Sequence, residues 1–397
     1  MNSFNYDELF PLLDGFRIEV PSWGFADTGT RFGKFHQSAA AATIEEKIED
    51  ASEVNRLTGA APTMAVHVLW DFKPRQSPSE VAQMAHNAGM RIGSINPNLF
   101  QDQIYKYGSC CSPLESARQR ADEHLEHCIE IGRATNSKFL SLWFADGTNY
   151  PGQDDIIARK HRMESALKKW HDAMPGDMTM LVEYKPFEPA FYHTDSADWG
   201  MAAHFARKAG PNAKVLVDTG HHLPGANIEQ IVAWLLDEEL LGGFHFNDRK
   251  YADDDLTLGS IDPYAVFRIF HEIRNAAHRG TDVSKIAYMI DQSHNLKPKV
   301  EAMLQTVVTA QELYLKACLV ERERLADFQA KTDIVGAEEL LRSAFYSDVQ
   351  PILKAWRESK SLPANPLDTY RASGYEAMRA KERSARRPDA GKGTSYA

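Results

Sequence analysis

An aspartate and a histidine stand three positions apart in the segment 217–222, which reads VDTGHH. The apolar run from Lys214 to Val217 predicts a short buried strand that the following Thr-Gly pair interrupts directly after Asp218. If the chain turns there, the His221 side chain lies on the same side as that of Asp218, and the two can bind one divalent cation together. Taken alone, an Asp-x-x-His pair is more often a capping or surface pair.

Three more potential ligands close other apolar runs. Glu183 ends the fifth run, His245 lies in the seventh, and Asp291 follows the eighth. We expect these side chains to meet Asp218 at one rim of a sheet, because reactive groups of parallel barrels gather at the carboxyl ends of strands. So much converging negative charge is difficult to compensate with salt bridges, and a cation resolves the repulsion.

The loop after the seventh run contains three consecutive aspartates, Asp253 to Asp255. In an extended segment Asp253 and Asp255 point to the same side, and with His221 they would form a second, more open site. The predicted division is one ion on Glu183, Asp218, His245 and Asp291, and another on His221, Asp253 and Asp255, with Asp218 as the bridge. An acidic surface loop is the alternative for the three aspartates alone.

Carboxylate and imidazole ligands without cysteine suit Mn²⁺, Mg²⁺ or Co²⁺, with Zn²⁺ also possible. Two such ions could hold neighbouring oxygens of one substrate. Lys185 would lie on the same inward face as Glu183 and place an ammonium against a developing alkoxide. Aromatic and imidazole rings at the rim suggest walls that stack on sugar faces, although a tryptophan is more common in a core than in a pocket. These rings belong to Trp23, His67, Trp70 and Trp143.

The elements that position these groups are eight apolar runs that alternate with helical patterns. They are 16–20, 64–69, 91–95, 139–144, 178–184, 214–218, 243–246 and 286–290. This alternation predicts an α/β fold in which a parallel sheet closes into a (β/α)₈ (TIM) barrel. An open doubly wound sheet is the alternative, but no Gly-x-Gly-x-x-Gly follows the first run.

Beyond the barrel, a long helical pattern runs from Val300 to Phe328 and continues to about Lys360. We therefore predict a catalytic barrel over residues 1–320 and a C-terminal helical extension over 321–397. Subunit contacts are the favoured use of this extension, and packing on its own barrel is the alternative. The basic stretch from Arg379 to Arg387 predicts a solvated, mobile tail.

The chain of 397 residues carries a net charge of −10, which opposes nonspecific nucleic-acid binding. No apolar run approaches the ~20 residues that cross a bilayer, and the first residues show no signal pattern. The four cysteines have no C-x-x-C spacing and are predicted to be reduced thiols. We expect a cytoplasmic protein without nucleic-acid or membrane partners.

Four segments together resemble the L-rhamnose isomerase family, in particular its shorter, broad-specificity branch. They are 183–186 (EYKP), 218–222 (DTGHH), 244–248 (FHFND) with Asp253 and Asp255, and 291–295 (DQSHN). In the related xylose isomerases the place of Asp218 usually holds Glu and that of His245 usually holds Asp, so the chain follows the rhamnose pattern. The resemblance implies an aldose–ketose isomerase with two Mn²⁺-like ions and a homotetramer. It also implies that the loop from Gly29 to Phe35, with Phe32, caps a neighbour's pocket.

The expected reaction converts L-rhamnose to L-rhamnulose, with D-allose to D-psicose as a second activity. Lys185 would lie near O1, His67 would assist ring opening, and a water or hydroxide near Asp255 would take the O2 proton. A direct hydride shift is favoured over an enediol route because no carboxylate is clear of ligand duty. The alternatives are an isomerase or epimerase of another free sugar, a zinc phosphodiesterase of the endonuclease IV type, and a non-catalytic sugar-binding barrel.

Overall fold

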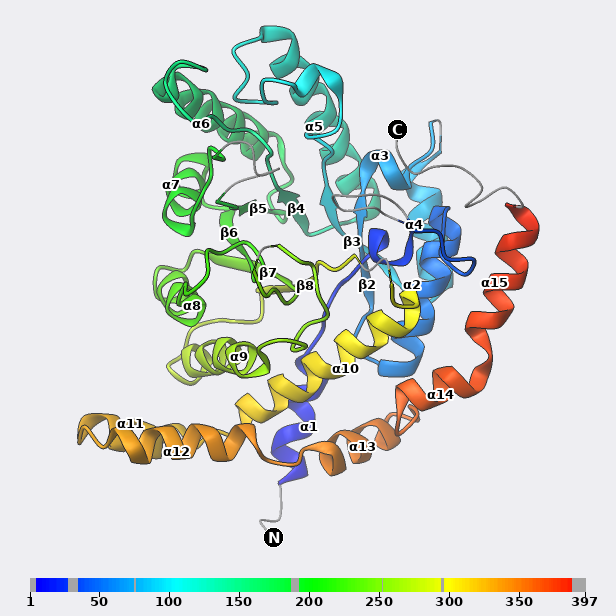
Figure 1. Cartoon of the computed structure of the whole chain (residues 1–397), viewed down its shortest axis with the longest axis vertical. Helices are drawn as coiled ribbons and strands as arrows, with labels where there is room; N and C mark the ends of the chain where they lie inside the picture. The colour runs from blue at the N-terminus through cyan, green and yellow to red at the C-terminus, as the bar shows by residue number, and fades with distance from the viewer. Residues whose placement is uncertain are drawn as a thin grey trace.

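In the computed structural model, residues 5–27, 35–74, 76–186, 193–251, 253–293 and 296–387 are described. Eight strands form a single sheet in chain order (Figure 1). They are β1 Val20–Pro21, β2 Thr63–His67, β3 Arg91–Asn96, β4 Phe139–Leu142, β5 Thr179–Glu183, β6 Ala213–Asp218, β7 Leu241–Phe246 and β8 Ala287–Ile290. Every neighbouring pair is parallel.

The first and last strands meet through Glu19, the residue before β1. Its backbone N–H donates to the Tyr288 carbonyl at 2.7 Å, and its carbonyl accepts from the Ile290 N–H at 2.9 Å. These bonds join the two edges of the sheet, and the predicted (β/α)₈ barrel is confirmed. Strand β7 is buried along its whole length, as expected for a parallel sheet that helices cover.

Helices follow the strands around the outside of the barrel (Figure 1). They are α1 Tyr6–Gly15, α2 Ile44–Thr58, α3 Val68–Asp71, α4 Pro78–Asn87, α5 Glu115–Thr135, α6 Ile156–Ala173, α7 Trp199–Ala209, α8 Ile228–Asp237, α9 Pro263–His278, α10 Lys299–Cys318, α11 Arg322–Ala330, α12 Ile334–Phe345, α13 Gln350–Ser359, α14 Pro366–Ser373 and α15 Tyr375–Arg386. The Thr43 side chain caps α2 by accepting from the Glu46 N–H at 3.3 Å. No helix within the described ranges is both long and apolar enough to span a membrane.

The first strand is shorter and later than its apolar pattern predicts. Phe16 and Ile18 are buried, yet the assigned strand begins only at Val20. Phe16 packs its ring against Phe270, Tyr288 and Tyr314. The apolar pattern therefore predicted the burial of Phe16 correctly, but this residue is buried by aromatic rings and not by a place in the strand.

The helical extension has a break that the sequence pattern did not show. The predicted run from Val300 to Phe328 divides into α10 and α11 at residues 319–321, so the predicted boundary at residue 320 falls between two helices. Helices α11 and α12 form a pair at one end of the molecule, whereas α13 to α15 return along the barrel (Figure 1). Trp356 of α13 is buried and donates to Asp14 of α1 at 2.9 Å. Use of this extension in subunit contacts stays a prediction.

The prediction of a solvated tail from Arg379 to Arg387 is wrong. This stretch forms most of α15 and packs against α2, and Arg383 is 2% exposed in a bidentate pair with Asp50. A count of basic residues shows no acidic partners, and the carboxylates that receive these arginines lie on a helix more than 300 residues earlier in the chain.

Candidate active site

The carboxyl ends of four consecutive strands bring the first four predicted ligands together. Glu183 is the last residue of β5, Asp218 the last of β6, His245 lies in β7, and Asp291 follows β8 directly. The register of β6 and β7 sets Asp218 beside His245. Glu183, Asp218 and His245 are each at most 3% exposed. The strand order thus assembles at one rim residues that lie 27 to 46 positions apart in the sequence.

Glu183 lies between two imidazoles. Its Oε1 is 3.0 Å from His221 Nδ1, and its Oε2 is 3.2 Å from His245 Nδ1. Asp218 Oδ2 is 3.8 Å from His221 Nε2 and 3.9 Å from His245 Nδ1. Asp291 Oδ2 lies 3.9 Å from the same nitrogen of His245. With Asp253, described next, we call this set the carboxylate–imidazole cluster: Glu183, Asp218, His221, His245, Asp253 and Asp291.

The predicted Asp-Asp-Asp loop contributes to the same place. Asp253 Oδ2 is 3.4 Å from His221 Nε2 and 2.7 Å from Lys185 Nζ. Asp255 hydrogen-bonds to Asp253, and both line the same cavity. Asp255 adopts φ 48°, a left-handed conformation that is uncommon outside glycine. The two aspartates therefore share a side, but a turn at Asp255 contributes to this and the segment is not simply extended.

Donor atoms of the cluster form two groups of three, each with all atoms within 4.8 Å. One group is Glu183, Asp218 and His221; the other is Asp218, His245 and Asp291. Asp218 belongs to both and is placed to bridge two cations. Glu183 contacts both histidines, so the structure groups it with His221 as well as with its predicted partner His245.

Gly220 lies where the neighbouring side chains leave no room for a Cβ atom. A Cβ at this position would lie 2.8 Å from Asn247 Oδ1 and 2.9 Å from Asp253 Oδ1. Its backbone N–H donates to Asp218 Oδ1 at 2.6 Å, and the Asn247 side-chain amide donates to the same oxygen at 3.0 Å. These two donors orient the Asp218 carboxylate and leave Oδ2 directed at the histidines.

The electrostatics of the cluster depend on burial and mutual charge. Burial raises the pKa of Asp218 to about 7, even though His221 opposes that shift. Burial disfavours the imidazolium of His245, but the Glu183 carboxylate outweighs it and raises the pKa of His245 to about 9. The pKa of His221 is also raised, against burial, by Asp218 and Asp253. In the absence of another cation, the two imidazolium groups provide the positive charge that the carboxylates require.

Unsatisfied atoms show that these residues fit a divalent cation. Among the described residues, Asp218 Oδ2 and both ring nitrogens of His245 are buried and make no hydrogen bond of good geometry, although His245 Nδ1 lies 3.2 Å from Glu183 Oε2. A buried polar atom without a partner costs about 1–3 kcal/mol, so such atoms rarely converge without a ligand between them. Carboxylate and imidazole donors without thiolate match the preferences of Mn²⁺, Co²⁺ and Mg²⁺, and Zn²⁺ is compatible.

A cavity of about 780 Å³ opens above the cluster. Its aromatic wall contains ring contacts of 4.8 Å between Trp23 and His67 and of 4.1 Å between His67 and Trp70. Trp143 also lines the cavity, with Lys185 Nζ 5.2 Å from its ring centre. The described predicted wall residues therefore share one pocket, whereas Phe32 lies outside the described residues.

Sequence reasoning missed several pocket residues. Phe100 lies 4.9 Å from Trp143 and continues the aromatic wall, but it sits in an irregular segment without periodicity. Asn247 orients Asp218, and its position two residues after His245 was the available signal. Arg387 lines the same cavity from the far end of the chain, and no local pattern connects it with the strands.

Comparison with known proteins agrees with this arrangement. The family described as Xylose isomerase-like TIM barrel matches residues 59–277. A probable sugar isomerase of Mesorhizobium japonicum is 40% identical over 96% of this chain and 89% of the relative. A probable sugar isomerase of Rhizobium meliloti is 40% identical over 93% of this chain and 86% of the relative.

Solved structures share the fold at low sequence identity. An L-ribulose 3-epimerase is 12% identical, with a TM-score of 0.56 over 77% of this chain and 98% of that chain. A D-allulose 3-epimerase from Methylomonas sp. is 12% identical, with a TM-score of 0.54 over 74% and 95%. With its barrel, its rim of carboxylates and imidazoles, and these relatives, the chain belongs to the xylose isomerase-like TIM barrel family.

Proposed function

We propose that the protein is a divalent-metal-dependent isomerase that interconverts a free aldose and its 2-ketose. The observation that carries this proposal is the carboxylate–imidazole cluster, with its unpartnered Asp218 and His245 atoms, at the floor of an aromatic cavity. Relatives named probable sugar isomerases support the reaction class. The sequence resemblance supports L-rhamnose as first substrate and D-allose as second.

The cluster would hold one or two divalent cations, with Mn²⁺ preferred and Co²⁺, Mg²⁺ or Zn²⁺ as alternatives. Bound cations would polarise adjacent sugar oxygens as Lewis acids. Lys185 is held 2.7 Å from Asp253 and would direct its ammonium at the sugar O1, where negative charge develops. The neighbouring Trp143 ring limits the freedom of that ammonium.

His67 and Asp255 are the proposed proton-handling groups. Burial lowers the pKa of His67 to about 3, so its imidazole is neutral at ordinary pH and can accept a hydrogen bond from the anomeric hydroxyl, whose proton passes to the ring oxygen as the ring opens. A water or hydroxide near Asp255, which lies beside Asp253 in the cavity, would accept the proton from O2. Hydrogen would then pass directly between C2 and C1, because the pocket carboxylates nearest the sugar belong to the proposed ligand set.

The test is metal removal with a chelator, followed by Mn²⁺, Co²⁺, Mg²⁺ or Zn²⁺ addition with L-rhamnose or D-allose, and chromatography of the products. We expect a 2-ketose only when a cation is present, and loss of turnover in Glu183→Gln. A product inverted at C3 would reassign the protein as an epimerase, and cleavage of abasic-site DNA would reassign it as a nuclease. Extensive loss of tritium from C2 to solvent would contradict direct hydrogen transfer.

The assembly is also proposed from the resemblance. A homotetramer would use the helical extension, residues 321–397, at its contacts and would place the loop containing Phe32 at a neighbour's pocket. Light scattering of the intact chain, beside that of a chain shortened after residue 320, measures the first point. A dimer or monomer for the intact chain would contradict it.

A further inference from the structure

The C-terminal arm, which we define as residues 366–387, reaches the sugar cavity. It comprises α14 and α15 and runs along the outside of the barrel beside α2 (Figure 1). Its last described residue, Arg387, lines the same cavity as Glu183 and His245. A segment outside the barrel therefore contributes directly to the pocket.

Buried ion pairs fix the arm on α2. Arg383 donates from Nη1 and Nη2 to the two carboxylate oxygens of Asp50 at 2.8 and 2.9 Å. Tyr375 donates to Asp50 at 2.8 Å, and Arg379 pairs with Glu49 one residue earlier. A bidentate arginine–carboxylate pair has strict geometry, and removing one partner from a buried pair is costly. The position of α15 relative to α2 is therefore well defined.

The arm then holds the segment that precedes α2. Arg383 donates to the Ala39 carbonyl, and Arg387 Nη2 donates to the Ala40 carbonyl at 2.8 Å. The Ala41 N–H donates to the Phe25 carbonyl at 2.9 Å, and both Ala41 and Ala42 line the cavity. The contacts thus pass from the arm into the cavity wall.

The same wall continues to the carboxylate–imidazole cluster. Trp23 lies in the short helix that also contains Phe25, and its indole N–H donates to Asp291 Oδ1 at 2.8 Å. The cluster lies at the carboxyl ends of the strands, whereas Arg387 follows α15, the helix that packs against the outer side of α2. The cavity therefore carries the cluster on one wall and Arg387 on another, so a sugar with its first two carbons at the cluster leaves the hydroxyls of its other end as the ones that can meet Arg387.

Arg387 retains hydrogen-bonding capacity at this place. Its Nη2 serves Ala40 and lies 3.4 Å from Glu46 Oε2, and its side chain is 29% exposed. Within the described ranges its Nη1 makes no hydrogen bond or ion pair, because both contacts to Ala40 and Glu46 use Nη2. A guanidinium carries five N–H donors, which suits the hydroxyl oxygens of a sugar.

We infer that the C-terminal arm forms one wall of the sugar pocket and that Arg387 determines specificity by donating to the hydroxyls distal from the carboxylate–imidazole cluster. This inference rests on the proposed isomerase function and deepens it. It assigns the arm a role inside its own subunit, and it makes the contribution of Arg387 depend on sugar length. Six-carbon sugars reach this residue better than five-carbon sugars.

The experiment compares Arg387→Ala with Arg386→Ala, the neighbouring last residue of α15. Arg386 is a matched control because it also lies 3.4 Å from Glu46 but is exposed and is not among the residues that line the cavity. Loss of a charged hydrogen bond predicts an increase of about tenfold in KM for a hexose, with kcat within about twofold. The KM for a pentose should change less, and Arg387→Lys should recover part of the hexose affinity. Thermal unfolding of both alanine variants checks that the fold is retained.

A binding measurement separates this inference from the proposed reaction. Quenching of tryptophan fluorescence by a hexitol and a pentitol reports occupancy of the cavity without turnover. Weaker hexitol binding in Arg387→Ala than in Arg386→Ala supports the inference. Equal KM and equal binding in the two variants overturn it and leave the isomerase proposal intact. Absence of any sugar or polyol binding by the unaltered protein overturns both.

Discussion

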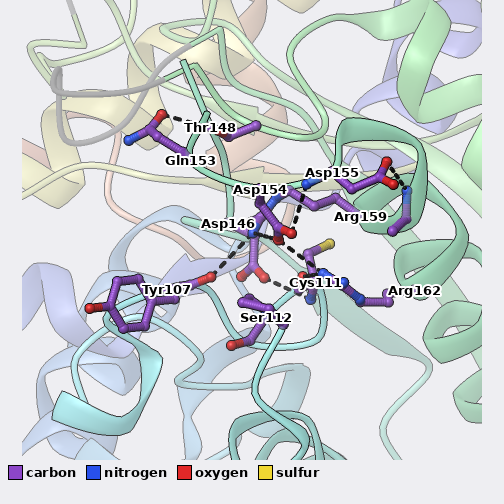
Figure 2. Close-up of polar contacts among 12 residues, drawn as sticks. Tyr107, Cys111, Ser112, Asp146, Thr148, Gln153, Asp154, Asp155, Arg159 and Arg162 are labelled. Carbon is purple, nitrogen blue, oxygen red and sulfur yellow. Dashed lines mark hydrogen bonds and ion pairs between the residues drawn. The ribbon is translucent and has the colours of Figure 1, made fainter. Parts of the chain in front are cut away.

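Two buried polar clusters lie near the same rim of the barrel and differ in how their charges are satisfied. The arginine-centred cluster, defined here as Asp146, Asp154, Arg159 and Asp195, is drawn in part in Figure 2. Arg159 donates to Asp195 at 2.8 Å and to Asp154 at 3.1 Å, and it is 2% exposed. Asp146 accepts two backbone N–H groups and the Ser109 hydroxyl. Its charges and hydrogen bonds are matched without any added group.

The carboxylate–imidazole cluster has the opposite character. It contains four carboxylates, and its two imidazoles have raised pKa values. Buried atoms of Asp218 and His245 make no hydrogen bond of good geometry to the described residues. Two clusters with similar burial can therefore have different roles. A network whose hydrogen bonds are all made stabilises the loops that contribute to it, whereas a network with unpaired buried atoms is suited to bind a ligand.

The same comparison applies to Cys110 and Cys111, which with Asp146 form a third group of possible ligands. Both Asp146 oxygens already accept hydrogen bonds, and burial raises the pKa of both thiols. A structural role for this group follows, in contrast to the cluster at β5 to β8.

The largest expected effect is on activity. Asp218→Asn should lower kcat by at least about 10³-fold, because it removes the carboxylate that both ligand groups share. Since burial disfavours the charged form of Asp218, the metal-free variant should unfold with a free energy equal to or up to about 1 kcal/mol above that of the unaltered protein. Steady-state kinetics and urea unfolding measure the two quantities. A large loss of stability would break the comparison.

Arg159→Leu should show the reverse pattern. It leaves Asp154 and Asp195 without their buried partner, so we expect a loss of about 3–4 kcal/mol in the free energy of unfolding. Lys160→Leu is the control, since its exposed pair with Glu164 contributes little. Urea unfolding in the presence of chelator is the measurement. Unchanged stability with lost activity would assign this cluster to the chemistry.

Cation binding should sharpen the contrast further. At a cation concentration about 100-fold above its Kd, the free energy of unfolding should rise by about 3 kcal/mol, because only the folded chain presents the site. Most of this increase should disappear in Asp218→Asn. An equal increase in both proteins would place the bound cation outside the carboxylate–imidazole cluster.

The smallest expected effect concerns His124, which belongs to neither cluster. Its Nε2 accepts from the Asn98 N–H at 2.8 Å, and burial lowers its pKa to about 4. A histidine with a depressed folded pKa stabilises above its unfolded value of about 6.5, and this stability is lost as pH falls toward 4. Between pH 7 and pH 5 we expect a loss of about 2 kcal/mol.

The check is the pH dependence of urea unfolding. His124→Gln should flatten the slope between pH 7 and pH 5, whereas His86→Gln, at an exposed position on α4, should leave it unchanged. If the slope survives in His124→Gln, the acid sensitivity belongs to another group, the carboxylate–imidazole cluster included.

Strand ends were the part of the site that local pattern could predict. The apolar runs that end at Glu183 and Asp218 are short, buried and interrupted by turn residues, so both the strand and its last residue were visible. Phe16 shows the limit of this reasoning, because an apolar residue reports burial and not the partner that buries it. Phe100 lies in an irregular segment where no period exists to be read.

The sequence by itself determined the barrel and the donor chemistry, because both depend on residue type and on spacing within short segments. Only the tertiary structure decided that Glu183 contacts both histidines and that the backbone at Asp255 is left-handed. It also decided that Arg383 pairs with a carboxylate of α2 and that Arg387 lines the cavity. Those outcomes depend on contacts between distant segments, whose geometry is set by packing of the whole chain and carries no local signal.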